Sequence, residues 1–396
     1  MKVLIWNVEK FTISRLTNTT IRKEGQFTSR KVTVEPARVE SYFQEVFTGG
    51  GDADYTPEVI AILELLTPKD PLGTLLGEGT AGAQGMFRLL KLIKQWTHNP
   101  AWRLVPPLKL NPKKPVGLDA KWAQNEAIGI LYDSSRVAFR GPNVWNNNQS
   151  LGPAVAGQPY GAAGSVWRKV AITGGTTNAG IVQYYDQAGT AIRFDDYHHR
   201  RPFLVDMQET YGTQRLIRLV FMHTSPGFHE GGTREMAKMT QLQPGTAGPP
   251  IVLCGGDFNV NDYDVASSVY SYRPLYDLRF RKRLTKEIDY STHYRPVSEA
   301  EPGGWTKYQK HQLIDNILIR HQTKTAAKNQ KYTSAAIDVV TPFPHPPYDT
   351  VMDIKLADYP TYQGQNPGPV GRFRQWPNFW HIRTTSDHTP IYVDIQ

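Results

Sequence analysis

Short runs of apolar residues, each bounded by glycine, proline or polar residues, recur along the chain. Runs of this length and composition are typical of buried β-strands. Helical spacing of apolar positions over 32–47, 86–96 and 235–243 predicts helices between them. The pattern therefore indicates an α/β protein. The strands are expected at 2–8, 58–66, 127–132, 166–173, 190–194, 204–207, 217–222, 251–254, 313–319 and after residue 388.

The stretch 251–260, IVLCGGDFNV, carries polar chemistry directly behind a buried strand. Two glycines end the apolar run and let the backbone bend sharply. Asp257 and Asn259 follow, and side chains two apart on extended backbone point the same way. A carboxylate beside an amide can bind a substrate phosphate, or a water molecule next to a metal ion. The same residue types also form ordinary turns, so this stretch alone leaves both interpretations open.

Other predicted strands also end in, or begin beside, polar side chains. In α/β sheets, ligands gather at strand ends, with residues drawn from distant parts of the chain. Carboxylate and amide oxygens together with histidines suit a hard cation such as Mg²⁺. The sequence contains no CxxC or HExxH spacing that would indicate zinc. The strand-end residues are Asn7, Glu64, His223, Asp315, Asp387 and His388.

The charge balance is basic, with 45 Lys and Arg against 36 Asp and Glu, a net charge of +9 and a pI of about 9.3. This excess favours a polyanionic partner such as nucleic acid or an anionic lipid surface, and it equally fits a basic protein with neither. The run 279–286, RFRKRLTK, concentrates the charge. It predicts either a solvated helix face or a contact with a phosphate backbone.

One cysteine, Cys254, lies within a predicted core strand, so no intrachain disulfide can form. No apolar run approaches the ~18 residues of a membrane span. The first apolar run is too short for a signal peptide, and Glu9 interrupts it. We therefore expect no classical signal peptide, and a protein that is cytoplasmic or exported by a non-classical route.

Six motifs occur in an order that resembles the endonuclease/exonuclease/phosphatase superfamily, the DNase I and exonuclease III group. They are WNV, EVIAILE, VFMHTSP, GGDFN, GWT followed by LIDNILI, and SDHTP. The resemblance implies a four-layer α/β/β/α sandwich with two packed mixed sheets flanked by helices. It implies a single domain over 1–396, with insertions at 67–122 and 321–383 that the motifs do not cover.

The resemblance also implies site residues and a cofactor. Mg²⁺, with Mn²⁺ as a substitute, would be held by Asn7, Glu64 and Asp387, with Glu9 as a further candidate. The implied catalytic residues are His223, Asp257, Asn259, Asp315 and His388, and the substrate-binding candidates are Arg201, Trp305, Thr306, Arg281 and Lys282.

Individual roles follow from the same resemblance. His388, oriented by Asp315, would activate water or stabilise the phosphate, and Asp257 is the other candidate base. Asn259 would align the substrate, and His223 would contact the phosphate or protonate the leaving oxygen. Two positions depart from the family pattern. Leu63 stands where the family usually has Gln, and for the family's additional catalytic Glu or Tyr only Tyr132 is a candidate.

These implications predict a metal-dependent phosphodiesterase. Within that class we expect a nuclease, with DNA as a substrate in preference to RNA. The basic charge balance favours nucleic acid as the substrate. The apolar Val260 after Asn259 favours it too, because the inositol 5-phosphatase branch usually carries Arg near that position. A phosphodiesterase or phosphatase acting on phospholipid or inositol phosphate is the alternative. Two further alternatives are a binding protein without catalysis and a nuclease toxin or effector, whose partner would be an inhibitor or immunity protein.

Overall fold

The computed structural model describes a set of segments from both ends and the middle of the chain, and all structural statements concern these. They are residues 1–17, 20–23, 30–33, 43–44, 46–48, 56–67, 80–105, 107–110, 126–141, 184–194, 200–225, 229–245, 249–260, 265–284, 293–294, 309–310, 313–321, 332–336, 388 and 390–396.

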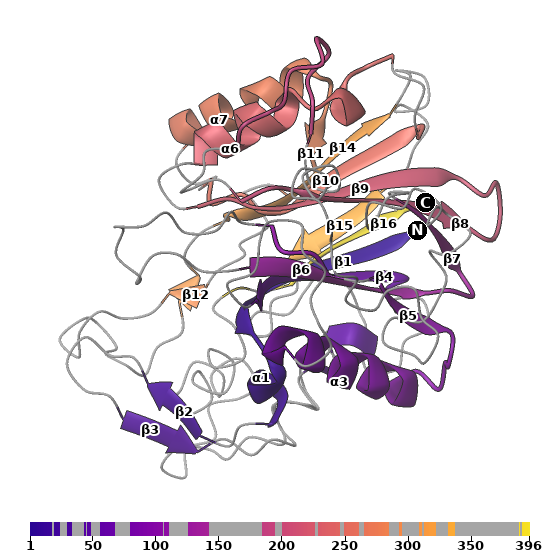
Figure 1. Cartoon of the computed structure of the whole chain (residues 1–396), viewed down its shortest axis with the longest axis vertical. Helices are drawn as coiled ribbons and strands as arrows, with labels where there is room; N and C mark the ends of the chain where they lie inside the picture. The colour runs from indigo at the N-terminus through magenta and orange to yellow at the C-terminus, as the bar shows by residue number, and fades with distance from the viewer. Residues whose placement is uncertain are drawn as a thin grey trace, which may run out of the picture.

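Two six-stranded mixed sheets form the centre of the molecule (Figure 1). The first has the order β15-β16-β1-β4-β6-β5, and its strands are β15 (Tyr332–Ala336), β16 (Ile391–Ile395), β1 (Lys2–Phe11), β4 (Val59–Leu66), β6 (Glu126–Asp133) and β5 (Trp102–Val105). The second has the order β11-β14-β10-β9-β8-β7, and its strands are β11 (Arg281–Lys282), β14 (Asp315–His321), β10 (Ile251–Asp257), β9 (Leu216–His223), β8 (Phe203–Glu209) and β7 (Val137–Gly141). Two small ribbons pair β2 (Thr20–Lys23) with β3 (Arg30–Thr33) and β12 (His293–Tyr294) with β13 (Gln309–Lys310).

Helices cover the outer face of each sheet, which gives the four layers α/β/β/α that the resemblance implied (Figure 1). α1 (Ile13–Thr17) and α3 (Ala81–Trp96) lie on the first sheet, and α6 (His229–Ala237) and α7 (Val265–Asp277) lie on the second. A short 3-10 helix, η2 (Thr240–Leu242), follows α6. No helix in the described segments is long and apolar enough to cross a membrane.

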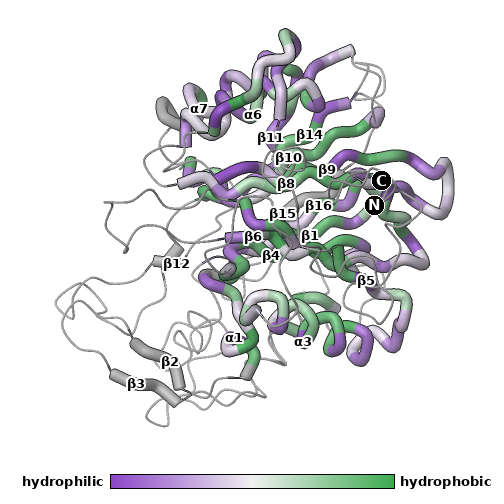
Figure 2. The backbone as a smooth tube through the Cα atoms, in the orientation of Figure 1, coloured by the Kyte–Doolittle hydropathy of each residue, from purple (hydrophilic) through white to green (hydrophobic). Residues whose placement is uncertain are grey.

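Apolar strands run through the middle of the sandwich (Figure 2). Every residue of β10 is buried, as expected for a strand covered on both faces. Leu253 belongs to the main core between the sheets, whereas Cys254 packs in the second core against the helices. The alternation of side chains along a strand explains this division.

Strand pairing brings the polar strand ends to one region. β10 runs parallel to β9, which places Asp257 opposite His223. It runs antiparallel to β14, which places the same Asp257 opposite Asp315. In the other sheet, β1 and β4 run parallel, and Asn7 pairs with Leu63 beside Glu64.

Most predicted strands are present, and three expectations about local structure were wrong. Residues 32–47 do not form one helix, because Val32 lies in strand β3, and among the described residues of this segment 43–44 and 46–47 are helical. The predicted strand at 190–194 is reduced to an isolated bridge between Tyr185 and Ala191. The basic run is not a helix face, because α7 ends at Asp277 and β11 pairs with the edge of β14. The predicted strand at 166–173 lies outside the described residues.

Two further segments differ in their bounds from the prediction. The helix expected over 235–243 begins earlier, at His229, and ends at Ala237 before η2. The segment 67–122 contributes α3 and β5 to the sandwich itself. The insertion boundaries at 67–122 and 321–383 stay predictions.

Candidate active site

Side chains from strands of both sheets, together with His388, meet at one end of the sandwich. Asn7, Glu64 and Glu126 come from β1, β4 and β6 of the first sheet, and His223, Asp257 and Asp315 come from β9, β10 and β14 of the second. All except Glu64 are buried. Direct polar contacts, described below, join the two sets into one cluster.

Asn7 links the two sheets. Its Nδ2 donates to Glu64 Oε1 at 3.1 Å and to Asp257 Oδ2 at 3.0 Å. The side chain is fully buried, and both hydrogens of its amide group bond to carboxylate oxygens. Asn7 therefore fixes the position of Glu64 relative to Asp257.

A local irregularity of the β1–β4 pair turns Glu64 toward the cluster. The strand register shifts between Asn7 and Phe11, and both Lys10 and Glu64 have left-handed backbone, with φ of 56° and 57°. The backbone N–H of Lys10 donates to Glu64 Oε2 at 3.1 Å. Bulges of this kind re-aim a side chain next to a functional site.

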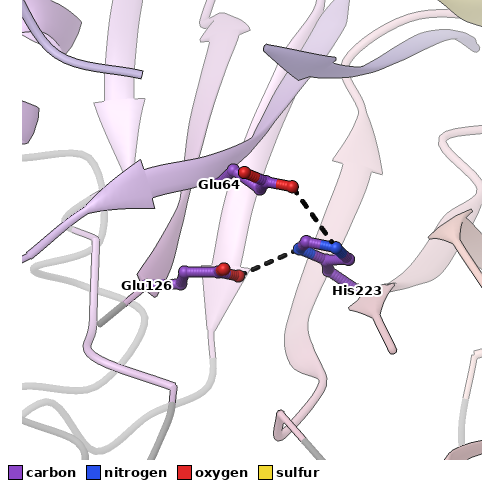
Figure 3. Close-up of side chains that lie close together, drawn as sticks. All are labelled: Glu64, Glu126 and His223. Carbon is purple, nitrogen blue, oxygen red and sulfur yellow. Dashed lines mark hydrogen bonds and ion pairs between the residues drawn. The ribbon is translucent and has the colours of Figure 1, made fainter. Parts of the chain in front are cut away.

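His223 lies between two carboxylates (Figure 3). Its Nδ1 is 2.9 Å from Glu126 Oε2, and its Nε2 is 3.4 Å from Glu64 Oε1. Arg200 Nε lies 2.8 Å from the same Oε2 of Glu126, and an Nη1 hydrogen of Arg200 bonds to the carbonyl of Thr224 at 3.0 Å. Glu126 is thus fixed by one cation and in turn orients the imidazole.

Glu126 was missed in the sequence, where Tyr132 was the candidate for this place. β6 runs antiparallel to β4, so the beginning of β6 meets the cluster, with Glu126 opposite Leu66. Tyr132 pairs with Val59 at the other end of the sheet and is buried there. The sequence signal for Glu126 was a glutamate directly before an apolar run. The direction of the strand decides whether its first or its last residue reaches the cluster, and the sequence does not show that direction.

His388 and Asp315 form the pair that the resemblance implied. His388 Nδ1 lies 2.7 Å from Asp315 Oδ2, and its Nε2 lies 3.7 Å from Asp257 Oδ2. Trp6 Nε1 donates to the carbonyl of His388 at 2.9 Å, which anchors the backbone behind the imidazole. The Nε2 atom of His223 lies 3.5 Å from the same oxygen of Asp257. Both histidines therefore face Asp257.

Asn259 lies in a turn and not on extended backbone. Its φ is 52°, its N–H donates to Asp257 Oδ1 at 2.9 Å, and its Nδ2 donates to the Thr224 carbonyl at 2.7 Å. The sequence had left a turn and a functional pair as alternatives. The structure shows the turn, and the turn orients the Asp257 carboxylate; the functional role of the pair stays a prediction.

The cluster is rich in buried acid, which shifts its protonation. Burial raises the pKa of Asp257, and the charge of Asp315 raises it further. Burial also raises the pKa of Glu126 against the opposing charge of Arg200. For His223, burial and the charge of Arg200 lower the pKa to about 3. Since a bound cation would favour the ionised carboxylates, these residues fit a hard metal ion.

Two groups of side chains have their donor atoms within 4.8 Å of one another, as a metal site requires. One consists of Glu64, Glu126 and His223, and the other of Asp257, Asp315 and His388. The expected ligands Asn7 and Glu64 lie in this cluster. Asp387 and the side chain of Glu9 lie outside the described part of the chain.

The predicted substrate-binding residues are not all gathered here. Arg201 is buried and acts electrostatically on Tyr184, and it is the neighbouring Arg200 that reaches the cluster. Arg281 and Lys282 pair with Ile319 and Leu318 of β14. That position is roughly 10–13 Å along the strand from Asp315, given about 3.3 Å per residue. Trp305 and Thr306 lie outside the described residues.

No protein-family model matches the sequence, and no curated protein does. Solved structures with a similar arrangement include Danio rerio TDP2 complexed with single-strand DNA product, at 14% identity, TM-score 0.42, and coverage of 100% of this chain and 98% of that chain. An endonuclease/exonuclease/phosphatase family protein from Leptotrichia buccalis has 12% identity and a TM-score of 0.44, covering 100% and 99%. The human Nocturnin catalytic domain with bound sulfate has 10% identity and a TM-score of 0.42, covering 100% and 94%.

The sequence motifs and the fold agree independently of those distant likenesses. Motifs that stand apart in the sequence end on neighbouring strands of two packed sheets, and the polar residues within them contact one another. The order of the motifs and the architecture that joins them agree with the four-layer α/β/β/α fold that the resemblance to the endonuclease/exonuclease/phosphatase superfamily implied.

Proposed function

We propose that the protein is a divalent-metal-dependent phosphodiesterase that hydrolyses nucleic acid, DNA in preference to RNA. One observation carries the proposal: the Nε2 atoms of His223 and His388 both face Asp257 Oδ2, at 3.5 Å and 3.7 Å. Each imidazole is backed at Nδ1 by its own carboxylate. Two oriented imidazoles and a carboxylate that converge in this way suit acid–base chemistry on a phosphodiester.

His388 is the candidate base or phosphate-stabilising group. Because an ionised carboxylate only accepts hydrogen bonds, the contact with Asp315 places the hydrogen on Nδ1 and leaves Nε2 directed at the site. In this tautomer Nε2 can accept a proton from water, and the charge of Asp315 stabilises the imidazolium that results. Asp257 is the alternative base, since burial holds its pKa above the ordinary range.

His223 is the candidate for contacting the phosphate or protonating the leaving oxygen. Glu126 fixes its Nδ1, and Arg200 fixes Glu126. Asn259 would align the substrate, with its own position set by Asp257 and Thr224. Asn7 holds two of the acidic side chains in register, which keeps the charged groups of both sheets in place.

Mg²⁺, with Mn²⁺ as a substitute, fits the acidic side of this cluster. Glu64 would be its principal ligand, with Asn7 beside it and Asp387 and Glu9 as further candidates. When bound, the ion polarises a phosphoryl oxygen and stabilises the charge that develops on it. The buried carboxylates supply the oxygen ligands that this ion prefers.

The preference for nucleic acid rests on charge. The chain carries a net charge of +9, although the candidate active site itself is acidic. The basic edge strand β11 pairs with β14, the strand that begins with Asp315. Arg281 is exposed there, and the ammonium of Lys282 lies 5.7 Å from the centre of the Tyr272 ring. These side chains would contact phosphates flanking the scissile bond.

The substrate class can be tested by comparing hydrolysis rates on candidate substrates. Initial rates in Mg²⁺ would be compared for single- and double-stranded DNA, RNA, sphingomyelin liposomes and inositol phosphates. We expect hydrolysis of DNA, with slower hydrolysis of RNA. Binding of DNA in EDTA should weaken in Arg281→Gln/Lys282→Gln, and the dependence of log K on log salt should flatten by about 1–2. Hydrolysis of the lipid or inositol substrates alone would overturn the proposed substrate.

A further inference from the structure

A row of charged side chains crosses the second sheet at the end opposite the candidate active site. The strand register pairs Asp206 with Arg218, Arg218 with Val252, and Val252 with Arg320. Val252 packs in the core formed with α6 and α7. Since paired residues share a face of a sheet, the whole row lies on the face that these helices cover. Two arginines therefore flank one valine, with Cα atoms about 10 Å apart.

Both sheet arginines are held in place by the surrounding structure. Arg218 makes a two-pronged contact with Asp206, at 2.8 Å from Nε and 2.9 Å from Nη2. Arg320 is 7% exposed, donates to the carbonyl of Leu242, and lies 5.1 Å from the centre of the Phe280 ring. Their guanidinium groups are thus preorganised, which lowers the entropic cost of binding a ligand.

Arg218, Val252 and Arg320 of this row line a pocket together with the loop after η2 and the residues that follow α7. Arg218, Arg320, Gln241 and Arg279 all line it, with Gly245 on the loop. Arg279 is exposed at the rim. Gln241 presents a buried Oε1 that has no hydrogen-bond partner among the described residues. An amide can offer either its oxygen or its NH₂ group to a ligand.

Positive charge in this pocket exceeds negative charge. Of the three arginines, Arg218 pairs with Asp206, and no carboxylate is among the described residues that line the pocket, so Arg279 and Arg320 leave two positive charges. Burial lowers the pKa of Arg320, and the charges of Arg218 and Arg279 lower it further. The arginines therefore repel one another, and an anion between them would remove that repulsion.

We propose that this arginine pocket (Arg218, Arg279, Arg320 and Gln241) binds a phosphate group, carried either by a small free molecule or by a nucleic-acid backbone. Asp206 already binds Nε and Nη2 of Arg218, so Arg279 and Arg320 would supply the guanidinium hydrogen bonds to the phosphate oxygens, while Arg218 adds positive charge. Val252, which lines the pocket, is separated from Asp257 by about 17 Å along strand β10. The site is thus separate from the candidate active site and does not depend on the proposed function.

Arg279 offers a variant that leaves the fold intact. Its φ is 70°, a left-handed conformation that disfavours residues with a Cβ atom and favours glycine. Arg279→Gly therefore removes one charge from the pocket without demanding a new backbone conformation. Arg273 is the matched control, because it is an exposed arginine of α7 that pairs with Asp277 at 2.8 Å and does not line the pocket.

Calorimetric titration with inorganic phosphate, in EDTA, tests the proposal. We expect saturable binding that weakens at least fivefold in Arg279→Gly, is retained in Arg279→Lys, and is unchanged in Arg273→Gln. Should Arg279→Gly fail to fold, Arg279→Asn, which also tolerates left-handed backbone, takes its place with the same expectation. Equal phosphate affinity in the wild type and the Arg279 variant would count against a free phosphate ligand.

A second titration separates the two sources of phosphate. Labelled single-stranded DNA would be added to the same variants in EDTA, which prevents cleavage by a metal-dependent enzyme. A loss of DNA affinity in Arg279→Gly, with a salt slope lower by about 0.7, would assign the pocket to the nucleic-acid backbone. An effect on inorganic phosphate alone would assign it to a free phosphate compound. If neither affinity changes, the proposal is wrong. These binding measurements do not depend on nuclease activity, so a failure of the proposed function would not change their outcome.

Discussion

His223 Nδ1 lies 2.9 Å from Glu126 Oε2, although the two residues are 97 positions apart and belong to different sheets. Both side chains are almost fully buried. The contact therefore couples the packing of the sandwich to the orientation of an imidazole in the candidate active site. Arg200 completes the arrangement by neutralising Glu126 from the other side.

Glu126→Gln should lower kcat by about 10–100-fold, as loss of a group that orients another functional residue typically does. The amide keeps the shape of the carboxylate, but it loses the charge that fixes the imidazole and pairs with Arg200. KM and the melting temperature are expected to change little. Glu230→Gln is the control, because this glutamate of α6 is 41% exposed at its side chain and pairs with Arg234. An unchanged kcat in Glu126→Gln would show that His223 needs no such partner.

Mg²⁺ should stabilise the folded protein through Glu64. A ligand that binds only the native state adds about 2.7 kcal/mol at one hundred times its Kd. Thermal unfolding of the wild type should therefore shift upward as Mg²⁺ is added, and Glu64→Gln should abolish the shift. This readout needs no substrate. Equal Mg²⁺-dependent shifts in the two proteins would place the ion elsewhere.

Acid should weaken the fold through Glu209, which is 2% exposed. Burial opposes ionisation of this carboxyl, but hydrogen bonds from Arg215 and from the N-terminal ammonium outweigh it and lower the pKa. Because the folded pKa lies below the unfolded value of about 4.3, ionised Glu209 stabilises the fold above that pH. This contribution is lost as the pH falls through the folded pKa.

Urea unfolding at several pH values checks this sign. Glu209→Gln should be less stable than the wild type at pH 7, and the difference should shrink as the pH falls toward 3. A difference that stays constant with pH would mean that Glu209 acts through packing rather than through its charge.

Gly256→Ala should destabilise the protein by roughly 3 kcal/mol, through strain and overpacking. Gly256 has φ of 141°, and an added Cβ would collide with the carbonyl of Met222 on β9. Gly212 is a useful comparison, because its φ is 56° but a Cβ there meets nothing within 4 Å. Gly212→Ala should cost only about 1–2 kcal/mol. Equal urea midpoints for the two variants would contradict the close approach at Gly256.

Much of the candidate site could be predicted because its residues follow apolar runs. His223 and Asp257 end strands β9 and β10, as the sequence pattern predicted, whereas Asn7 lies inside β1, which continues to Phe11. Glu126 could not be chosen in the same way, because a strand that enters the site at its beginning is recognised only when its direction is known.

Other features depended on partners that no local pattern reveals. Arg281 and Lys282 follow a helix in sequence, yet pairing with β14 makes them an edge strand. Arg218 and Arg320 look like interruptions of two apolar strands, and only the register with Val252 brings them together. Segment 32–47 had helical spacing, but its first part pairs as a strand with β2. Tertiary pairing overrides local propensity in each case.

The most direct test of the central claim is nicking of supercoiled plasmid DNA, with Mg²⁺ and with EDTA, by the wild type and by His388→Ala. We expect nicking by the wild type only in Mg²⁺, and a rate lower by roughly 10²–10⁴-fold in His388→Ala. His98→Asn, at an exposed left-handed position after α3, should match the wild type. No nicking in Mg²⁺ or Mn²⁺, or wild-type nicking by His388→Ala, would contradict a DNA phosphodiesterase centred on this histidine.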